Sequence, residues 1–250
     1  MRTKAAISFG LVDVTAKPDG TFIAKHKQPF VDMQQLKRDE LEIRKYATLE
    51  KDYFRLDGTF ELFPDNTIEH DFGLWSASMS DENGEFTTPV VLTIEFTESH
   101  SSFGLTFTFH EPTNNYCNIL NVKWYDGINN LLSDMNFNPS STVYFADNAI
   151  ENYKKIVITF YSTNKPYRYL KLVQLDFGQI KLFSDDDLIS ANILEEVDPI
   201  SAELRINTLD LTLHSRNTEF SILNPEEVFK LLQQRIDVFR QMEQYQLEII

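Results

Sequence analysis

Two segments of the chain place an aromatic side chain close to amide and carboxylate groups. The first segment contains Trp75, Asp81, Glu82 and Asn83, and the second contains Asn114, Asn115 and Tyr116. An aromatic ring can pack against the face of a pyranose while nearby polar groups bind its hydroxyls. The segments Trp75–Thr88 and Glu111–Asn118 therefore predict a shallow glycan site, of low affinity and dependent on avidity. Two alternatives stay open: loops that only connect strands or dock a neighbouring protein, and a Trp75 that belongs to the core.

Motifs for catalysis and cofactor binding are absent from the sequence. It has no Gly-x-Ser-x-Gly, no His-Glu-x-x-His, no phosphate loop and no dinucleotide fingerprint. The five histidines are scattered, and Cys117 is the only cysteine, which excludes an intrachain disulfide and a cysteine-based metal site. Among the 38 acidic residues some pair could match the spacing of a glycosidase, but so many acids make that coincidence uninformative. We therefore expect no catalytic residue, no metal and no cofactor.

The formal net charge of −15 limits the partners that this chain can have. So acidic a protein repels a phosphate backbone, and its densest basic run is Lys25–Lys27, so nucleic-acid binding is not expected. No stretch approaches the ~18 apolar residues of a membrane span. The beginning of the chain is broken by Ser8, Gly10 and Asp13, so it predicts a first strand rather than a secretory signal. These features favour a protein made and folded in the bacterial cytoplasm.

Alternation of apolar and polar residues predicts most of the elements that carry the two segments. Strands are expected at 5–14, 90–96, 103–109, 120–125, 142–146, 155–162, 167–175 and 178–183. Asp57-Gly58 predicts a hairpin turn, and residues 32–48 predict a helix. Short strands separated by Gly, Pro, Asn and Ser clusters indicate a mainly β chain with an antiparallel sandwich or barrel.

The order of these strands resembles a discoidin or galactose-binding-like jelly roll. The resemblance covers residues 60–180 and is carried by Thr87–Phe109, Asn121–Gly127, Lys154–Phe160 and Tyr167–Gly178, with Trp75-Ser-Ala-Ser78 in a preceding polar loop and the YLKL strand near its end. It implies a jelly-roll-like β-sandwich over residues 50–183. Because loops alternate between the two ends of a jelly roll, it also implies that the two aromatic segments meet at one end.

A second resemblance concerns Asp198–Pro225. Ile200, Ala202, Leu204 and Ile206 lie on even positions, whereas Leu209, Leu211 and Leu213 lie on odd ones. A bulge near Asn207–Thr208 would keep both sets on one buried face. With the Asn224-Pro225 helix start and the segment Leu231–Arg235, this order resembles the opening of the first β-barrel domain in bacteriophage tail and baseplate hub proteins.

Together the patterns predict three regions: an N-terminal strand and connecting segment (1–49), a galactose-binding-like sandwich (50–183), and a hub-like β segment with a terminal helix (184–250). The resemblances imply a structural, non-enzymatic component of a phage tail or baseplate that contacts surface glycans. Other tail subunits or a second copy would cover its apolar edge, and its final location would be the virion tail. The alternative is a stand-alone carbohydrate-binding module of a bacterial surface or polysaccharide system.

Overall fold

The computed structural model describes most of the first three quarters of the chain and two short stretches beyond them. The described residues are 7–31, 33–37, 46–51, 53, 57–58, 73–183, 188–194 and 208–213. They fall into two compact units, Val12–Gln179 and a second unit formed by Met1–Leu11 with Ile180–Ile250. No helix in the described part of the chain is long and apolar enough to cross a membrane.

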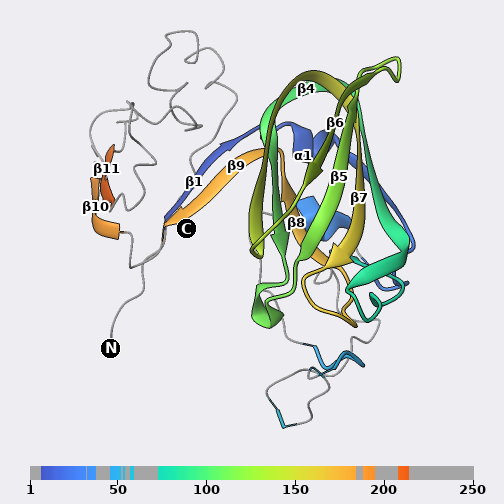
Figure 1. Ribbon diagram of the computed structural model, residues 1–250. Coiled ribbons are helices and arrows are strands. Elements are labelled where there is room, and N and C mark those ends of the chain that lie inside the picture. Colours follow the sequence, from blue (N-terminus) through green and yellow to red (C-terminus); the bar gives the residue numbers. More distant parts are fainter. Residues whose placement is uncertain are drawn as a thin grey trace. The chain divides into compact units, whose positions relative to one another are not determined.

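The chain is mainly antiparallel β, as the sequence predicts (Figure 1). Its strands are β1 (Ile7–Val12), β2 (Thr21–Lys25), β3 (Leu74–Trp75), β4 (Glu85–Phe109), β5 (Cys117–Tyr125), β6 (Leu131–Phe137), β7 (Val143–Thr163), β8 (Lys171–Asp176), β9 (Gly178–Phe183), β10 (Leu188–Leu194) and β11 (Thr208–Leu213). The helical turns are α1 (Ala16–Asp19), η1 (Met33–Lys37) and η2 (Glu111–Thr113). β1 pairs with β9, β10 pairs with β11, and the other seven strands form the sandwich.

Two very long strands, β4 and β7, build the sandwich by pairing along almost their whole length. The antiparallel ladder runs from Glu85 opposite Ser162 to Thr108 opposite Val143, with register shifts between Glu95 and Gly104. The shifts mark a bend, where both strands cross from one layer to the other at the top of Figure 1. One pair of strands therefore supplies the centre of both layers.

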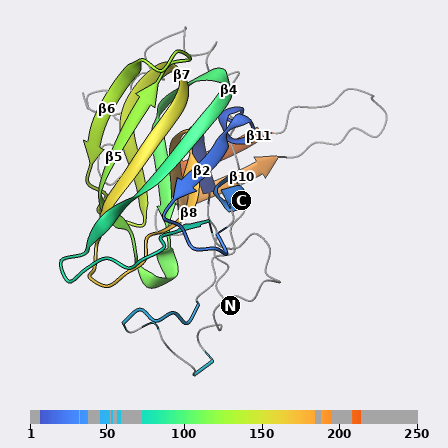
Figure 2. The same ribbon diagram turned by 90° about the vertical axis from the view of Figure 1, so that its right-hand side faces the viewer.

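The remaining strands extend each layer outward from this pair. In the first layer the order is β2, the first half of β4, the second half of β7, β5 and β6, which Figure 2 shows side by side. In the second layer β8 pairs with the second half of β4, and β3 pairs with β8. The space between the layers is filled by the apolar residues of the predicted alternating runs, among them Val90, Leu92, Ile94, Leu105, Phe107, Phe109, Leu120, Val122, Trp124, Ile156, Ile158 and Phe160. These runs are therefore confirmed as core-facing strands.

A buried histidine fixes the segment before β2 to the bend. Nδ1 of His100 lies 2.8 Å from a carboxylate oxygen of Asp13, and Nε2 lies 3.0 Å from one of Asp19. Thr15 also donates its hydroxyl proton to Asp13, at 2.6 Å. Both ring nitrogens of His100 therefore face a carboxylate oxygen. α1 is thereby tied to the turn of β4 by side-chain contacts rather than by a strand ladder.

Several predicted elements differ in extent from the observed ones. The separate strands predicted within 90–109 and within 142–162 are continuous in β4 and β7, because their ladder bends without breaking. β2 belongs to the sandwich, since its backbone pairs with β4 from Thr21 opposite Glu95 onward, so part of the predicted connecting segment 1–49 lies in the sheet. The strand predicted at 167–175 begins only at Lys171, because the preceding residues form a loop.

The helix predicted at 32–48 is observed only as η1, and residues 46–48 are not helical. The predicted strand at 209–213 is confirmed as part of β11. Most of the hairpin predicted around Asp57-Gly58, the bulge at Asn207, the beginning of the predicted third region at 184–187 and the terminal helix predicted after Asn224-Pro225 lie outside the described residues.

Gly104 is required at the bend, so we expect Gly104→Ala to destabilise the sandwich strongly. Its φ is +150°, and an added Cβ would lie 2.2 Å from the backbone oxygen of Ala146 on β7. Neither backbone can yield without breaking the ladder, and a loss of about 2 kcal/mol or more in unfolding free energy is expected. Gly127→Ala is the matched control, because its added Cβ would meet only the flexible side chain of Lys154. Urea denaturation compares the two, and equal midpoints would contradict the assignment of strain to Gly104.

The contacts of Asp19 lead to a second prediction, that the protein loses stability in acid. The backbone amide of Glu98 and the His100 side chain lower the pKa of Asp19 from 3.8 to about 2. A lowered pKa in the folded state adds stability above pH 3.8 that disappears as the pH falls toward 2. We expect Asp19→Asn to be less stable than wild type at pH 6, with a smaller further loss between pH 4 and 2. Unfolding followed by circular dichroism at each pH measures this, and parallel pH profiles would refute it.

Candidate functional site

Three connecting segments meet at the end of the sandwich opposite the bend, at the bottom of Figure 1. We call these segments, 75–84, 110–116 and 163–170, the loop end. Thr163 donates its backbone N–H to Gly84 at 2.7 Å, and Asn164 donates its own to Tyr116 at 2.9 Å. The third segment therefore lies between the other two. This places the two predicted aromatic segments at the same end of the molecule.

Trp75, the aromatic residue predicted to support a sugar, is only 3% exposed. Its ring lies against Phe30, Tyr169 and His110, with ring centroids 5.7 to 6.3 Å apart. β3 pairs with β8, and this pairing turns Trp75 into a small cluster with Tyr46. Trp75 is therefore a buried residue, as in the alternative that assigned it to the core.

The predicted polar residues of the first segment are at the surface. Asp81, Glu82 and Asn83 are all exposed and form a turn. The Oδ1 atom of Asp81 accepts the backbone N–H groups of Asn83 and Glu85, each at 2.8 Å. This turn presents a carboxylate and an amide to solvent on a constrained backbone.

The predicted residues of the second segment differ in exposure. Asn114 is exposed and has a φ of +46°, Asn115 is buried, and Tyr116 is half-buried. Asn115 donates its amide to the backbone oxygen of Tyr169 at 2.9 Å, and Asn164 donates its own to the backbone oxygen of Asn114 at 3.0 Å. Asn114 and Tyr116 thus reach solvent, while Asn115 ties the segment to its neighbour.

Tyr167 is the most exposed aromatic residue of the loop end, with 48% of its surface exposed. It has a φ of +55°, a conformation that is costly for a bulky side chain. Its backbone N–H donates to Asp81 at 3.2 Å, which anchors it beside the first turn. Alternation alone places Tyr167 in a strand and gives no sign of its exposure; Asn164-Lys165-Pro166 before it is the turn signal that indicates a loop.

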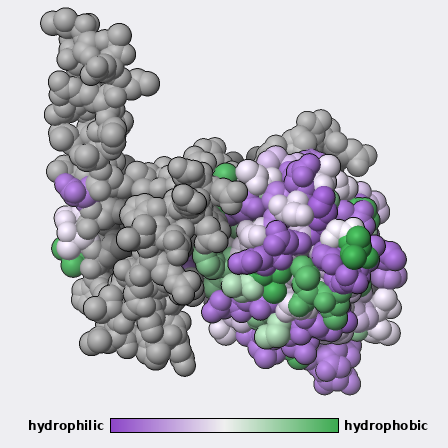
Figure 3. All heavy atoms as spheres, turned by 90° about the horizontal axis from the view of Figure 1, so that it is seen from above, coloured by the Kyte–Doolittle hydropathy of each residue, from purple (hydrophilic) through white to green (hydrophobic). Residues whose placement is uncertain are grey.

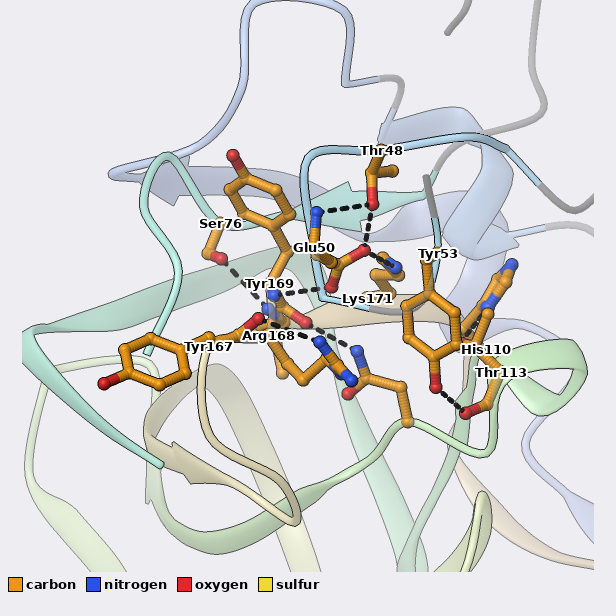
Figure 4. Close-up of polar contacts among 12 residues, drawn as sticks. Thr48, Glu50, Tyr53, Ser76, His110, Thr113, Tyr167, Arg168, Tyr169 and Lys171 are labelled. Atoms are coloured by element: carbon orange, nitrogen blue, oxygen red, sulfur yellow. Dashed lines mark hydrogen bonds and ion pairs between the residues drawn. The ribbon is translucent and has the colours of Figure 1, made fainter. Parts of the chain in front are cut away.

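Behind this surface lies a buried ion pair, drawn in Figure 4. Nζ of Lys171 donates to Oε2 of Glu50 at 2.5 Å, and both side chains are almost fully buried. The same oxygen accepts the hydroxyl of Thr48 at 2.5 Å, and Oε1 accepts the backbone N–H of Tyr169 at 2.9 Å. The carboxylate of Glu50 is therefore bound through both oxygens.

Arginine and aromatic side chains surround this pair. The guanidinium of Arg168 lies 4.4 Å from the ring centroid of Tyr53, and the ammonium of Lys171 lies 4.7 Å from that of Trp75. Tyr53 donates its hydroxyl proton to the backbone oxygen of Thr113 at 2.6 Å. Two buried atoms, Nε of Arg168 and Oδ1 of Asn115, have no hydrogen-bond partner within the described part of the chain.

The pKa values here reflect burial. Burial lowers the pKa of Lys171 and the charge of Glu50 opposes that shift, whereas burial raises the pKa of Tyr169. Burial also raises the pKa of Cys117 to about 12, which makes its thiol a poor nucleophile. No group of three or more His, Cys, Asp or Glu residues among those described could hold a metal ion.

Comparisons with known proteins give structural similarity at low sequence identity. No protein-family model and no curated protein matches the sequence. Among solved structures, a family 32 carbohydrate-binding module from NanJ of Clostridium perfringens, in complex with galactose, is similar at 10% identity and a TM-score of 0.42, covering 72% of this chain and 100% of that module.

A second family 32 module from C. perfringens, in complex with GalNAc-β-1,3-galactose, has 13% identity and a TM-score of 0.38, covering 64% of this chain and 96% of its own. A fucose-binding module from Streptococcus pneumoniae has 10% identity and a TM-score of 0.39, covering 66% and 96%. All three TM-scores lie below 0.5.

Breaking the buried pair on one side should be costly, and removing both charges should be less so. Lys171→Met leaves the carboxylate of Glu50 buried without its cation, for which we expect a loss of about 3–5 kcal/mol in unfolding free energy. The double variant Glu50→Gln, Lys171→Met should recover a large part of that loss. Chemical denaturation of the two variants tests this, and a double variant as unstable as Lys171→Met would contradict it.

Proposed function

We propose that the chain acts as a non-catalytic glycan-binding module whose ligand meets the loop end. The observation that carries the proposal is Tyr167, an exposed aromatic side chain on a backbone held in a left-handed conformation. Such strain persists where the surrounding structure imposes it, and it is concentrated at binding sites. A rigid, half-exposed tyrosine supports a pyranose ring without losing much side-chain entropy on binding.

Polar groups of the right kind flank this ring on the two neighbouring segments. Glu82 and Asn83 are exposed on the turn that accepts the backbone of Tyr167. Asn114 is exposed on the other side, where Asn164 joins the two segments. Carboxylate and amide groups bind sugar hydroxyls as acceptors and donors. Of the seven residues predicted from the sequence, these surface positions fit direct contact with a glycan, and Trp75 and Asn115 fit support from beneath.

Tyr167→Ala should abolish most glycan binding without unfolding the protein. A neutral-glycan array, followed by titration with any hit, compares this variant with wild type, and we expect a loss of about tenfold or more in affinity. Tyr125→Ala is the matched control, because Tyr125 lies at the opposite end of β5 and contacts Lys155 there. Figure 3 looks onto that opposite end. Equal binding by both variants, or no binding by wild type, would overturn the proposal.

The tail or baseplate role stays a prediction from the sequence. It rests on residues 198–250, of which the structure describes Thr208–Leu213 alone. Glycan binding at the loop end is compatible both with a tail or baseplate role and with a stand-alone module. Contacts with tail subunits or with a second copy of the chain also stay predictions.

A further inference from the structure

We infer that the groups that bind the Glu50 carboxylate form a second ligand site, distinct from the surface at Tyr167. At this site the carboxylate of a sugar acid displaces that of Glu50. The inference goes beyond the proposed function, because it concerns the buried groups around Glu50 and Lys171 rather than the exposed surface at Tyr167. The segment that carries Glu50, residues 46–51 with Tyr53, is called the strap. The strap lies over Lys171, Arg168 and Trp75.

The groups that bind Glu50 form a carboxylate-binding site of familiar composition. One oxygen receives the ammonium of Lys171, and the other receives the backbone N–H of Tyr169. Both donors belong to the body of the sandwich, on β8 and the loop just before it. A charged donor and a backbone amide directed at two oxygens of one group are what a free carboxylate requires.

Two residues close to the ion pair also carry polar atoms that Glu50 leaves unused: Arg168 packs on Tyr53 of the strap, and Asn115 binds the backbone of Tyr169. Nε of Arg168 is a donor and Oδ1 of Asn115 is an acceptor, and within the described residues neither has a partner. Buried polar groups without partners are rare, and each costs free energy in the folded protein. A ligand with hydroxyl groups next to its carboxylate can satisfy both atoms, whereas a glutamate side chain cannot.

Tyr53 and Glu50 attach the strap, and a ligand can replace the contact that Glu50 makes. Tyr53 covers the guanidinium of Arg168 and donates to the backbone of Thr113, and Glu50 supplies the ion pair. A hexuronate offers a carboxylate in place of Glu50 and ring hydroxyls for Arg168 and Asn115, beside the aromatic ring of Trp75. Lys171 is paired with a carboxylate both before and after the exchange, so neither state carries the penalty of a lone buried charge.

Removal of the internal carboxylate provides the direct test. Glu50→Ala should melt at a lower temperature than wild type and should be restabilised by D-galacturonate or D-glucuronate more than by acetate at equal concentration. Sodium chloride and D-galactose should have no such effect, because neither supplies a carboxylate with hydroxyls. In Glu50→Ala, Lys171→Met the restabilisation should disappear. Uronates that act no better than acetate, or than sodium chloride, would overturn the inference.

A milder variant keeps the test decisive if Glu50→Ala does not fold. Tyr53→Phe retains the ring over Arg168 and removes the hydroxyl that binds Thr113, so the strap opens more readily while Glu50 stays in place. Loss of one hydrogen bond should lower the apparent Kd for D-galacturonate about fivefold relative to wild type, followed by tryptophan fluorescence. An unchanged Kd, or no detectable binding to either protein, would overturn the inference.

Tyr167→Ala separates this inference from the proposed function. That variant should lose neutral-glycan binding at the surface and keep its response to uronates. A loss of both together would contradict the existence of a separate carboxylate site at Lys171.

Discussion

The sandwich depends on the ladder between β4 and β7. These two strands are the central pair of both layers, so every other sandwich strand is placed by direct or indirect pairing with them. The ladder stays paired through its bend because register shifts and Gly104 let one backbone approach the other closely. Loops from distant parts of the sequence are thereby brought to one end.

Buried contacts between carboxylates and basic side chains attach the parts of this unit that strands do not hold. At the bend, His100 contacts Asp13 and Asp19 and fixes the turn before β2. At the loop end, Glu50 contacts Lys171 and fixes the strap. Pairs of this kind add little net stability, but an unpaired partner is costly, so each segment is confined to one position. The two ends of the sandwich use the same physical device for different segments.

The aromatic residues of the loop end divide into supporting and exposed ones. Trp75 is enclosed by other rings and by Lys171, and it stiffens the base of the loops. Tyr167 lies on the loop before β8 and faces solvent. An exposed side chain on a constrained backbone is suited to binding, because little freedom remains to be lost when a ligand arrives.

The sequence by itself determined the mainly β class and the strands of the core. It also identified two segments that each combine an aromatic residue with polar ones. Alternation such as Val90, Leu92 and Ile94 reports which face is buried, and that information is local. Only the tertiary structure decided that β4 and β7 are continuous and that Trp75 is inside while Tyr167 is outside. It also decided that Glu50 meets Lys171, more than a hundred residues away. Such choices depend on contacts between distant residues, and no local pattern encodes them.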